Sequence, residues 1–141
     1  KERQKAIRSA IAATAVKELV VGRGHRIVKL SVPIIVEDNL QGLKKTKDVI
    51  QFLSKIGLDE ELARVSEKKV RAGKGKTRGR RYKKKVGPLF VIADDKGIVK
   101  AVKNIPGANV CRVKNLSAEY LAPGTKPGRL TIFTKSAVER L

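Results

Sequence analysis

The chain is poor in residues that cross-link or fill a core with aromatic rings. Its 141 residues include one cysteine, Cys111, no methionine and only 4% aromatic residues. A single cysteine excludes an internal disulfide and fits a reducing cytoplasm, and the apolar residues around Cys111 predict a buried thiol. The core must therefore rest on valine, isoleucine, leucine and alanine. Because the chain starts at Lys1 and contains no methionine, we expect it to be part of a longer reading frame.

Long apolar runs and acidic residues are scarce too. No run approaches the ~20 apolar residues that a membrane-spanning helix needs, and no secretory signal is present. There are 13 acidic residues against 33 basic ones, so the formal charge is +20. A charge of this size predicts a polyanionic partner that offsets the self-repulsion, and neither a membrane nor a small-molecule substrate.

The remaining composition is that of a folded chain. Apolar residues make up 41% of it, which excludes a disordered chain, and 141 residues suit one domain, residues 1–141, with one core. Eleven of the 33 basic residues fall between Lys68 and Lys85, where no acid occurs. We interpret residues 68–87 as a basic glycine-rich insertion within that domain.

Strand and helix patterns alternate in the second half. Short apolar runs predict strands, and amphipathic segments predict helices, with Gly57 and the pair Pro106-Gly107 as stops. The apolar face of the first helix comprises Ile7, Ala10, Ile11 and Thr14 or Ala15; the face of the helix at 46–56 comprises Val49, Ile50, Leu53 and Ile56. Helices are expected at 4–16, 46–56 (capped by Thr46), 59–66, 96–105, 117–122 (capped by Ser117) and 135–141; strands are expected at 32–38, 87–95, 108–113 and 129–134. Residues 17–32 are ambiguous, with a loop at 22–27.

This order predicts an α/β fold. We expect an open, mostly parallel sheet of about four strands with helices on both faces, joined by right-handed crossovers, plus a basic irregular arm. The segment 32–38 is a continuous apolar run that ends in two acids, which indicates a strand covered on both faces.

Two phosphate-binding motifs fail on spacing. Gly75-Lys76-Thr77 matches the end of a nucleotide-hydrolase loop, but Val70 stands where that loop requires glycine. The spacing of Gly73, Gly75 and Gly79 is one residue too long for a dinucleotide fingerprint. No cofactor site is indicated.

Two acid pairs follow strands, Glu37-Asp38 and Asp94-Asp95. If they converged, they could bind Mg²⁺ for phosphoryl chemistry, so an enzyme of that class remains an alternative. We interpret both pairs as turn and helix-start residues, and we expect no catalytic residue and no metal site.

The basic insertion favours polynucleotide binding over an idle solvated run. Arginine offers a planar fork for phosphate, glycine allows close backbone approach, and Tyr82 can stack on a base or ribose. Five arginines are considered in and beside the insertion: Arg64, Arg71, Arg78, Arg80 and Arg81. RNA is favoured over DNA, because no helix-turn-helix, zinc finger or basic zipper is present; another basic nucleic-acid-binding protein, such as a DNA-compacting one, is the second alternative. The candidate RNA-binding residues are Arg71, Gly73, Lys74, Gly75, Lys76, Arg78, Gly79, Arg80, Arg81, Tyr82, Lys83, Lys84 and Lys85 in the arm, Arg3, Lys5 and Arg8 in the first helix, and Arg23, His25 and Arg26 in the glycine loop; Lys126 and Arg129 are weaker candidates.

Four blocks carry a family resemblance: "KERQKAIRSAIAATA", "VRAGKGKTRGRRY", "KGIVKAVKNIPGANV" and "LAPGTKPGRLTIFTKSAVERL". Together they resemble large-subunit ribosomal protein four in its archaeal and eukaryotic form, and the early end of the chain favours an archaeal source. The resemblance implies a structural constituent of the large ribosomal subunit, a monomer that binds and helps fold its RNA, contacts neighbouring ribosomal proteins, lies in the cytoplasm and is not an enzyme. The family's N-terminal strand and tunnel loop would precede Lys1, so no residue here is assigned to the tunnel.

Overall fold

Four parallel strands form the centre of the computed structural model, which describes residues 1–27 and 30–141. The strands are β1 (Ile34–Val36), β4 (Leu89–Ile92), β5 (Asn109–Arg112) and β6 (Thr131–Thr134). Their order is β1-β6-β4-β5, with parallel pairing throughout. β4 and β6 lie in the middle and are buried along their whole length; β4 is apolar throughout, as burial on both faces requires, and β6 has a threonine at each end. The predicted open parallel sheet is confirmed.

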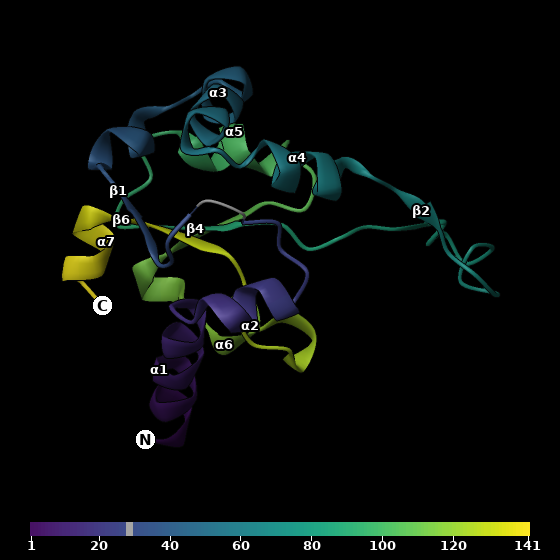
Figure 1. Ribbon diagram of the computed structural model, residues 1–141, viewed down its shortest axis with the longest axis horizontal. Coiled ribbons are helices and arrows are strands. Elements are labelled where there is room, and N and C mark those ends of the chain that lie inside the picture. The colour runs from purple at the N-terminus through teal and green to yellow at the C-terminus, as the bar shows by residue number, and fades with distance from the viewer. Residues whose placement is uncertain (28–29) are drawn as a thin grey trace.

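Helices cover both faces of this sheet (Figure 1). Phe90 and Ile92 of β4 belong to one apolar cluster with residues of α3 and α5, whereas Leu89 and Val91 belong to a second with residues of α6 and α7. Alternate residues of one strand therefore serve two layers of core. The helices are α1 (Glu2–Thr14), α2 (Lys17–Gly22), α3 (Thr46–Ile56), α4 (Asp59–Ser66), α5 (Ile98–Lys103), α6 (Ala118–Leu121) and α7 (Lys135–Glu139), with 3₁₀ turns at Asp38–Gly42, Val113–Asn115 and Pro123–Thr125. Among the described residues, no helix is both long and apolar enough to cross a membrane.

The helix at 46–56 is confirmed in its bounds but not in its details. It ends at Gly57, whose φ of 91° is left-handed. Thr46 is not its cap: it is the first helical residue, and its hydroxyl donates to the carbonyl of Ala101 across the gap to α5 (3.0 Å). Ile50, predicted on the buried face, is exposed, because Val49 and Leu53 are the residues of this helix buried in the core and Phe52 and Ile56 pack beside them. Ser117 does precede α6, but no capping hydrogen bond from its side chain occurs in the described chain.

Two parts of the first third differ from expectation. Within the ambiguous stretch 17–32, residues 17–22 form α2, and residues 28–29 lie outside the described part of the chain. β1 was expected to be covered on both faces, but it is an edge strand and Ile35 is 55% exposed. Ile35 lines an open apolar groove together with residues of α1 and α7, so that face of β1 is only partly covered.

The basic insertion is a hairpin and not an irregular segment throughout. β2 (Lys69–Val70) pairs antiparallel with β3 (Tyr82–Lys83) in a separate two-stranded sheet. The hairpin extends away from the body between α4 and β4 (Figure 1). Its strands are two residues long, which is too short to show as a strand pattern in the sequence.

Candidate nucleic-acid interface

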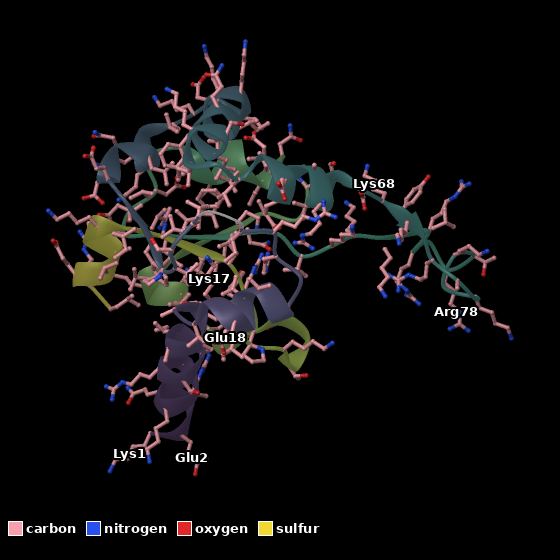
Figure 2. The ribbon with its side chains drawn as sticks, in the orientation of Figure 1. Lys1, Glu2, Lys17, Glu18, Lys68 and Arg78 are labelled. Atoms are coloured by element: carbon pink, nitrogen blue, oxygen red, sulfur yellow. The ribbon has the colours of Figure 1, made fainter. Side chains whose placement is uncertain are left out.

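The arm, residues 67–85, contains no buried residue and projects from the body into solvent (Figure 2). Its ladder pairs Lys69 with Lys83 and Val70 with Tyr82, and the amide of Arg71 donates to the carbonyl of Arg81 (2.8 Å). Both faces of this ribbon are therefore open to a partner.

The tip of the arm has hydrogen bonds of its own. The amide of Arg80 donates to the carbonyl of Gly75 (3.1 Å), and the hydroxyl of Thr77 donates to the carbonyl of Lys74 (2.8 Å). Gly73 and Gly79 take left-handed φ values of 77° and 76° on either side of the tip. The segment Gly75–Thr77 is thus part of a hairpin tip and not a strand-to-helix loop, which agrees with the rejection of the nucleotide-hydrolase motif.

Most of the positive charge on the arm has no carboxylate partner within the described chain. Of its eleven basic residues, Lys85 alone forms an ion pair, with Glu67 at 2.6 Å, and that bond lowers the pKa of the Glu67 carboxyl. Arg71 donates from Nε to the carbonyl of Arg80 (3.1 Å), so part of its guanidinium is occupied. The other arm arginines and lysines are exposed and can bind phosphate.

Tyr82 is the one aromatic side chain on the arm. It is 47% exposed, and the guanidinium of Arg81 lies 5.8 Å from the centroid of its ring. Because it stands opposite Val70 on the same face of the ribbon, the two make a small apolar surface among charges. A ring in this position is accessible to a base.

A second basic projection comes from the first helix. Arg3, Lys5 and Arg8 are exposed on α1, while Ile7, Ala10 and Ile11 of the same helix are partly buried and Thr14 is buried, which confirms the predicted small-residue face. α1 leaves the body in a different direction from the arm (Figure 2). The sequence-predicted residues therefore form two separate basic surfaces.

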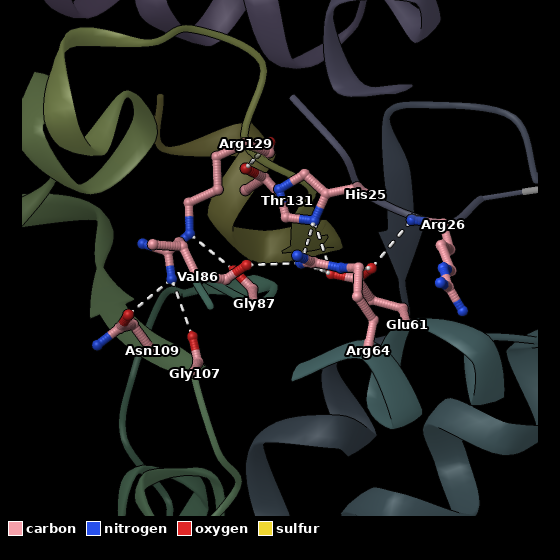
Figure 3. Close-up of polar contacts among 10 residues, drawn as sticks. All are labelled: His25, Arg26, Glu61, Arg64, Val86, Gly87, Gly107, Asn109, Arg129 and Thr131. Atoms are coloured by element: carbon pink, nitrogen blue, oxygen red, sulfur yellow. Dashed lines mark hydrogen bonds and ion pairs between the residues drawn. The ribbon is translucent and has the colours of Figure 1, made fainter. Parts of the chain in front are cut away.

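His25 is not on either surface, and its assignment as an RNA contact or solvated residue is wrong. It is 3% exposed, and its Nδ1 lies 2.6 Å from Oε1 of Glu61 (Figure 3). The Glu61 carboxylate also accepts from the amide of Arg26 (3.0 Å) and from Nε and Nη2 of Arg64 (2.8 and 2.7 Å). Burial alone would raise the pKa of Glu61, but the hydrogen bonds from Arg64, His25 and Arg26 outweigh it and lower the pKa to about 2.

Arg64 and Arg129 also turn inward, which corrects their place among phosphate-binding candidates. Arg129 is 2% exposed and donates to the carbonyls of Gly87 (2.9 Å), Tyr120 (2.9 Å) and Gly107 (3.4 Å) and to Oδ1 of Asn109 (2.6 Å). Burial lowers the pKa of Arg129 to about 10, so the side chain stays charged at neutral pH. The basic residues beside His25 and beside the Pro-Gly turn led to the prediction of phosphate binding. No pattern in the sequence distinguishes an arginine that binds buried carbonyls from one that faces solvent.

The remaining loop residues differ from one another. Arg23 is half-buried and donates to the carbonyls of Lys126 and Pro123, so most of its fork is occupied inside the protein. Burial lowers the pKa of its guanidinium. The side chains of Arg26 and Lys126 are exposed. Of the glycine-loop candidates, Arg26 is the one with an available charged group.

The acid pairs have structural partners. Asp38 accepts from the hydroxyl and amide of Ser136 (2.5 and 3.1 Å), bonds that lower the pKa of Asp38. Asp95 accepts from the amide of Gly97 at the start of α5 (2.9 Å), and Asp94 pairs with Arg140 at 3.0 Å. These contacts match the interpretation as turn and helix-start residues. No cluster of three or more potential metal ligands occurs among residues 1–27 and 30–141.

The comparisons with known proteins agree with this geometry. The family model described as the ribosomal protein L4/L1 family matches residues 1–141. The large ribosomal subunit protein uL4 of Nanoarchaeum equitans is 55% identical over 142 residues, and the match covers 100% of this chain and 52% of that protein. The uL4 proteins of Archaeoglobus fulgidus (51% identical) and Methanosphaera stadtmanae (47% identical) are matched over 100% of this chain and over 56% and 55% of their own lengths. The chain thus spans about half the length of these relatives.

A projecting basic hairpin on a parallel α/β body, together with a match over all 141 residues, leads to one assignment. The chain belongs to the ribosomal protein L4/L1 family.

Proposed function

We propose that this chain is a structural constituent of the large ribosomal subunit that binds and helps fold large-subunit ribosomal RNA through the arm. The observation that carries the proposal is the solvent exposure of the arm, ten of whose basic side chains have no carboxylate partner among the described residues. A segment without burial gains stability from a partner, and phosphate is the partner that arginine and lysine bind best.

The arm suits folded RNA better than uniform duplex DNA. It is a narrow ribbon with charge on both faces and one accessible aromatic ring, so it can enter an irregular site and be contacted from both sides. The exposed residues of α1, Arg3, Lys5 and Arg8, supply a second contact in another direction. Such a protein acts as a monomer beside neighbouring ribosomal proteins, in the cytoplasm, and not as an enzyme; its uL4 relatives are named as large-subunit proteins.

The salt dependence of RNA binding tests the role of the arm. Replacing Arg78, Arg80, Arg81 and Lys83 by glutamine removes four phosphate contacts. Each contact releases counterions and contributes about 0.7 to 0.9 to the slope of log affinity against log salt, so the slope should fall by about three. The measurement is titration of the full-length protein with deproteinised large-subunit ribosomal RNA at several NaCl concentrations.

A matched control removes four exposed charges from the body, at Lys100, Lys103, Lys114 and Lys135. This variant should keep most of the slope. If the arm variant has the same salt slope as the unmodified protein, the RNA-binding surface lies elsewhere on the molecule. If the unmodified protein binds duplex DNA and ribosomal RNA with equal affinity at the same salt, it is a general nucleic-acid-binding protein.

A further inference from the structure

The arm meets the body at a short segment, Val86-Gly87, where burial begins abruptly. Residues 67–85 contain no buried side chain, whereas Gly87 and the strand that follows it are buried. The arm begins directly after α4, at Glu67, and its other connection to the body is made by Val86 and Gly87, whose contacts fix the strand that returns to the body. Both of their carbonyl groups accept a hydrogen bond from an arginine side chain, and the two arginines come from different parts of the chain.

Arg64 of α4 holds the first carbonyl. Its Nη2 donates to the carbonyl of Val86 (2.7 Å), and its guanidinium is oriented by the two hydrogen bonds to the buried carboxylate of Glu61. Since that carboxylate is itself held by His25 and by the amide of Arg26, the fork of Arg64 has a single orientation (Figure 3). The group that donates to Val86 is thus oriented by a buried polar network in which His25 Nε2 is the one side-chain atom without a hydrogen-bond partner among the described residues.

Arg129, just before β6, holds the second carbonyl. Its Nε donates to Gly87 (2.9 Å), and its other groups bind Tyr120, Gly107 and Asn109, so one buried side chain links the arm root to the ends of two further elements. No carboxylate lies among these partners. A buried cation held only by neutral acceptors is an expensive way to stabilise a core, which points to a geometric role.

The backbone is also tightly packed at Val86-Gly87. The amide of Gly87 donates to the carbonyl of Gly107 (2.9 Å). A Cβ atom on Gly87 would lie 2.9 Å from Cγ1 of Val65, and one on Gly107 would lie 2.5 Å from the carbonyl oxygen of Lys85. The chain passes here with no space for a side chain, so the root cannot pivot without breaking several contacts together.

We propose that Arg64 and Arg129 are positioning residues that fix the direction of the arm before RNA binds. This inference rests on the proposed RNA-binding role of the arm. Val86 and Gly87 form the root of the arm, the segment where it returns to the body. Because the two arginines hold this root, the arm keeps one orientation, and RNA binding does not require a change in the population of arm orientations. If a loosened arm occupied about ten directions equally, the apparent RNA affinity would fall about tenfold, because only the competent fraction binds.

The test uses a charge-conserving pair of substitutions, Arg64→Lys with Arg129→Lys, in the full-length protein. Lysine keeps the charge but lacks the fork that bonds several oxygens at once. Spin labels on Thr77→Cys at the arm tip and Lys55→Cys on α3, in a Cys111→Ala background, report the distribution of arm-to-body distances. Compared with the same labelled protein that keeps both arginines, we expect a broader distribution and a roughly tenfold loss of affinity for deproteinised large-subunit ribosomal RNA, with an unchanged salt slope because the two arginine-to-lysine substitutions remove no charge. Arg140→Lys, an exposed arginine away from the root, should change neither readout.

A second variant leaves the buried arginines intact in case the double variant does not fold. Inserting three glycines after Glu67 and three between Lys85 and Val86 loosens both connections between the arm and the body, and it should broaden the distances and weaken binding in the same way. A narrow distribution, or full affinity, in a folded variant of either kind overturns the proposal. Failure of the proposed function has another signature, an unchanged salt slope when arm charges are removed, so the two failures are distinguishable.

Discussion

Glu61 shows how much the role of a residue depends on what surrounds it. In the sequence it is one of several acids in a short helix, yet in the structure it is fully buried and accepts hydrogen bonds from His25, Arg64 and the amide of Arg26. It is the acceptor on which Arg64 depends for its orientation. Its carboxylate must be charged for this network to exist.

The stability of the protein should therefore depend on pH through Glu61. Its pKa is lowered from 4.5 to about 2 in the folded state, so the stabilisation is complete above pH ~4.5 and is lost as the pH falls toward 2. This shift corresponds to at most about 3 kcal/mol of unfolding free energy. Urea denaturation of the unmodified protein and of Glu61→Gln, measured between pH 6 and pH 2, should show a difference in stability that shrinks over this range.

The exposed neighbour Glu60 provides the control. Glu60→Gln leaves the network intact, so its stability should follow that of the unmodified protein at every pH. A Glu61→Gln protein that retains the full acid-induced loss would show that other carboxyl groups are responsible.

At the scale of elements, the arm is separate from the body in energy as well as in space. Its residues are exposed, and the cooperative core consists of the two apolar clusters on either side of the sheet. An element that buries nothing contributes little to the unfolding free energy. We expect the arm to contribute to the free energy of RNA binding.

A shortened arm tests separately whether the arm contributes to stability and whether it contributes to RNA binding. Lys69 and Lys83 are directly paired, so residues 70–82 can be replaced by Asn-Gly, a two-residue hairpin turn. We expect the unfolding free energy to change by less than about 0.5 kcal/mol, as for a surface change. With six basic residues removed, the RNA salt slope should fall by about four to five. A large drop in the denaturation midpoint would instead place the arm within the folding unit.

At the scale of the whole molecule, the net charge of +20 is the excess of 33 basic over 13 acidic residues, so ion pairs within the chain cannot reduce it. Of the four ion pairs that lysine and arginine form in the described chain, three are at exposed positions, where such pairs stabilise by about 0 to 1 kcal/mol each. Repulsion among the remaining charges should dominate the electrostatic free energy of the isolated protein.

Added NaCl should then raise the melting temperature of the free protein between about 0.05 and 0.5 M, because screening weakens this repulsion. The same salt weakens RNA binding, so stability and affinity change in opposite directions. Thermal denaturation followed by circular dichroism measures the first effect, and the protein with the shortened arm should show a smaller rise. A melting temperature that falls with salt would mean that attractive pairs outweigh the repulsion.

Much of the fold was predictable because its signals are local. The runs around Leu89–Ile92 and Thr131–Thr134 and the glycine at position 57 predicted two strands and the end of a helix, and all three are confirmed. The exposure of Ile35 and Ile50 was missed, since it depends on which neighbouring elements cover each position. The short ladder of the arm was missed because two paired residues leave no period to detect.

The sequence alone determined the charge, the alternation of strands and helices, and the position of the basic arm. These follow from composition and from short-range periodicity, which act within a few residues. The tertiary structure alone decided which positive side chains face outward. Arg64 and Arg129 have the same side chain as the arm arginines, yet oxygens inside the fold bind their guanidinium groups: the Glu61 carboxylate and the Val86 carbonyl bind Arg64, and carbonyls from distant segments bind Arg129. Hydrogen-bond partners of this kind exist only once the elements have packed together.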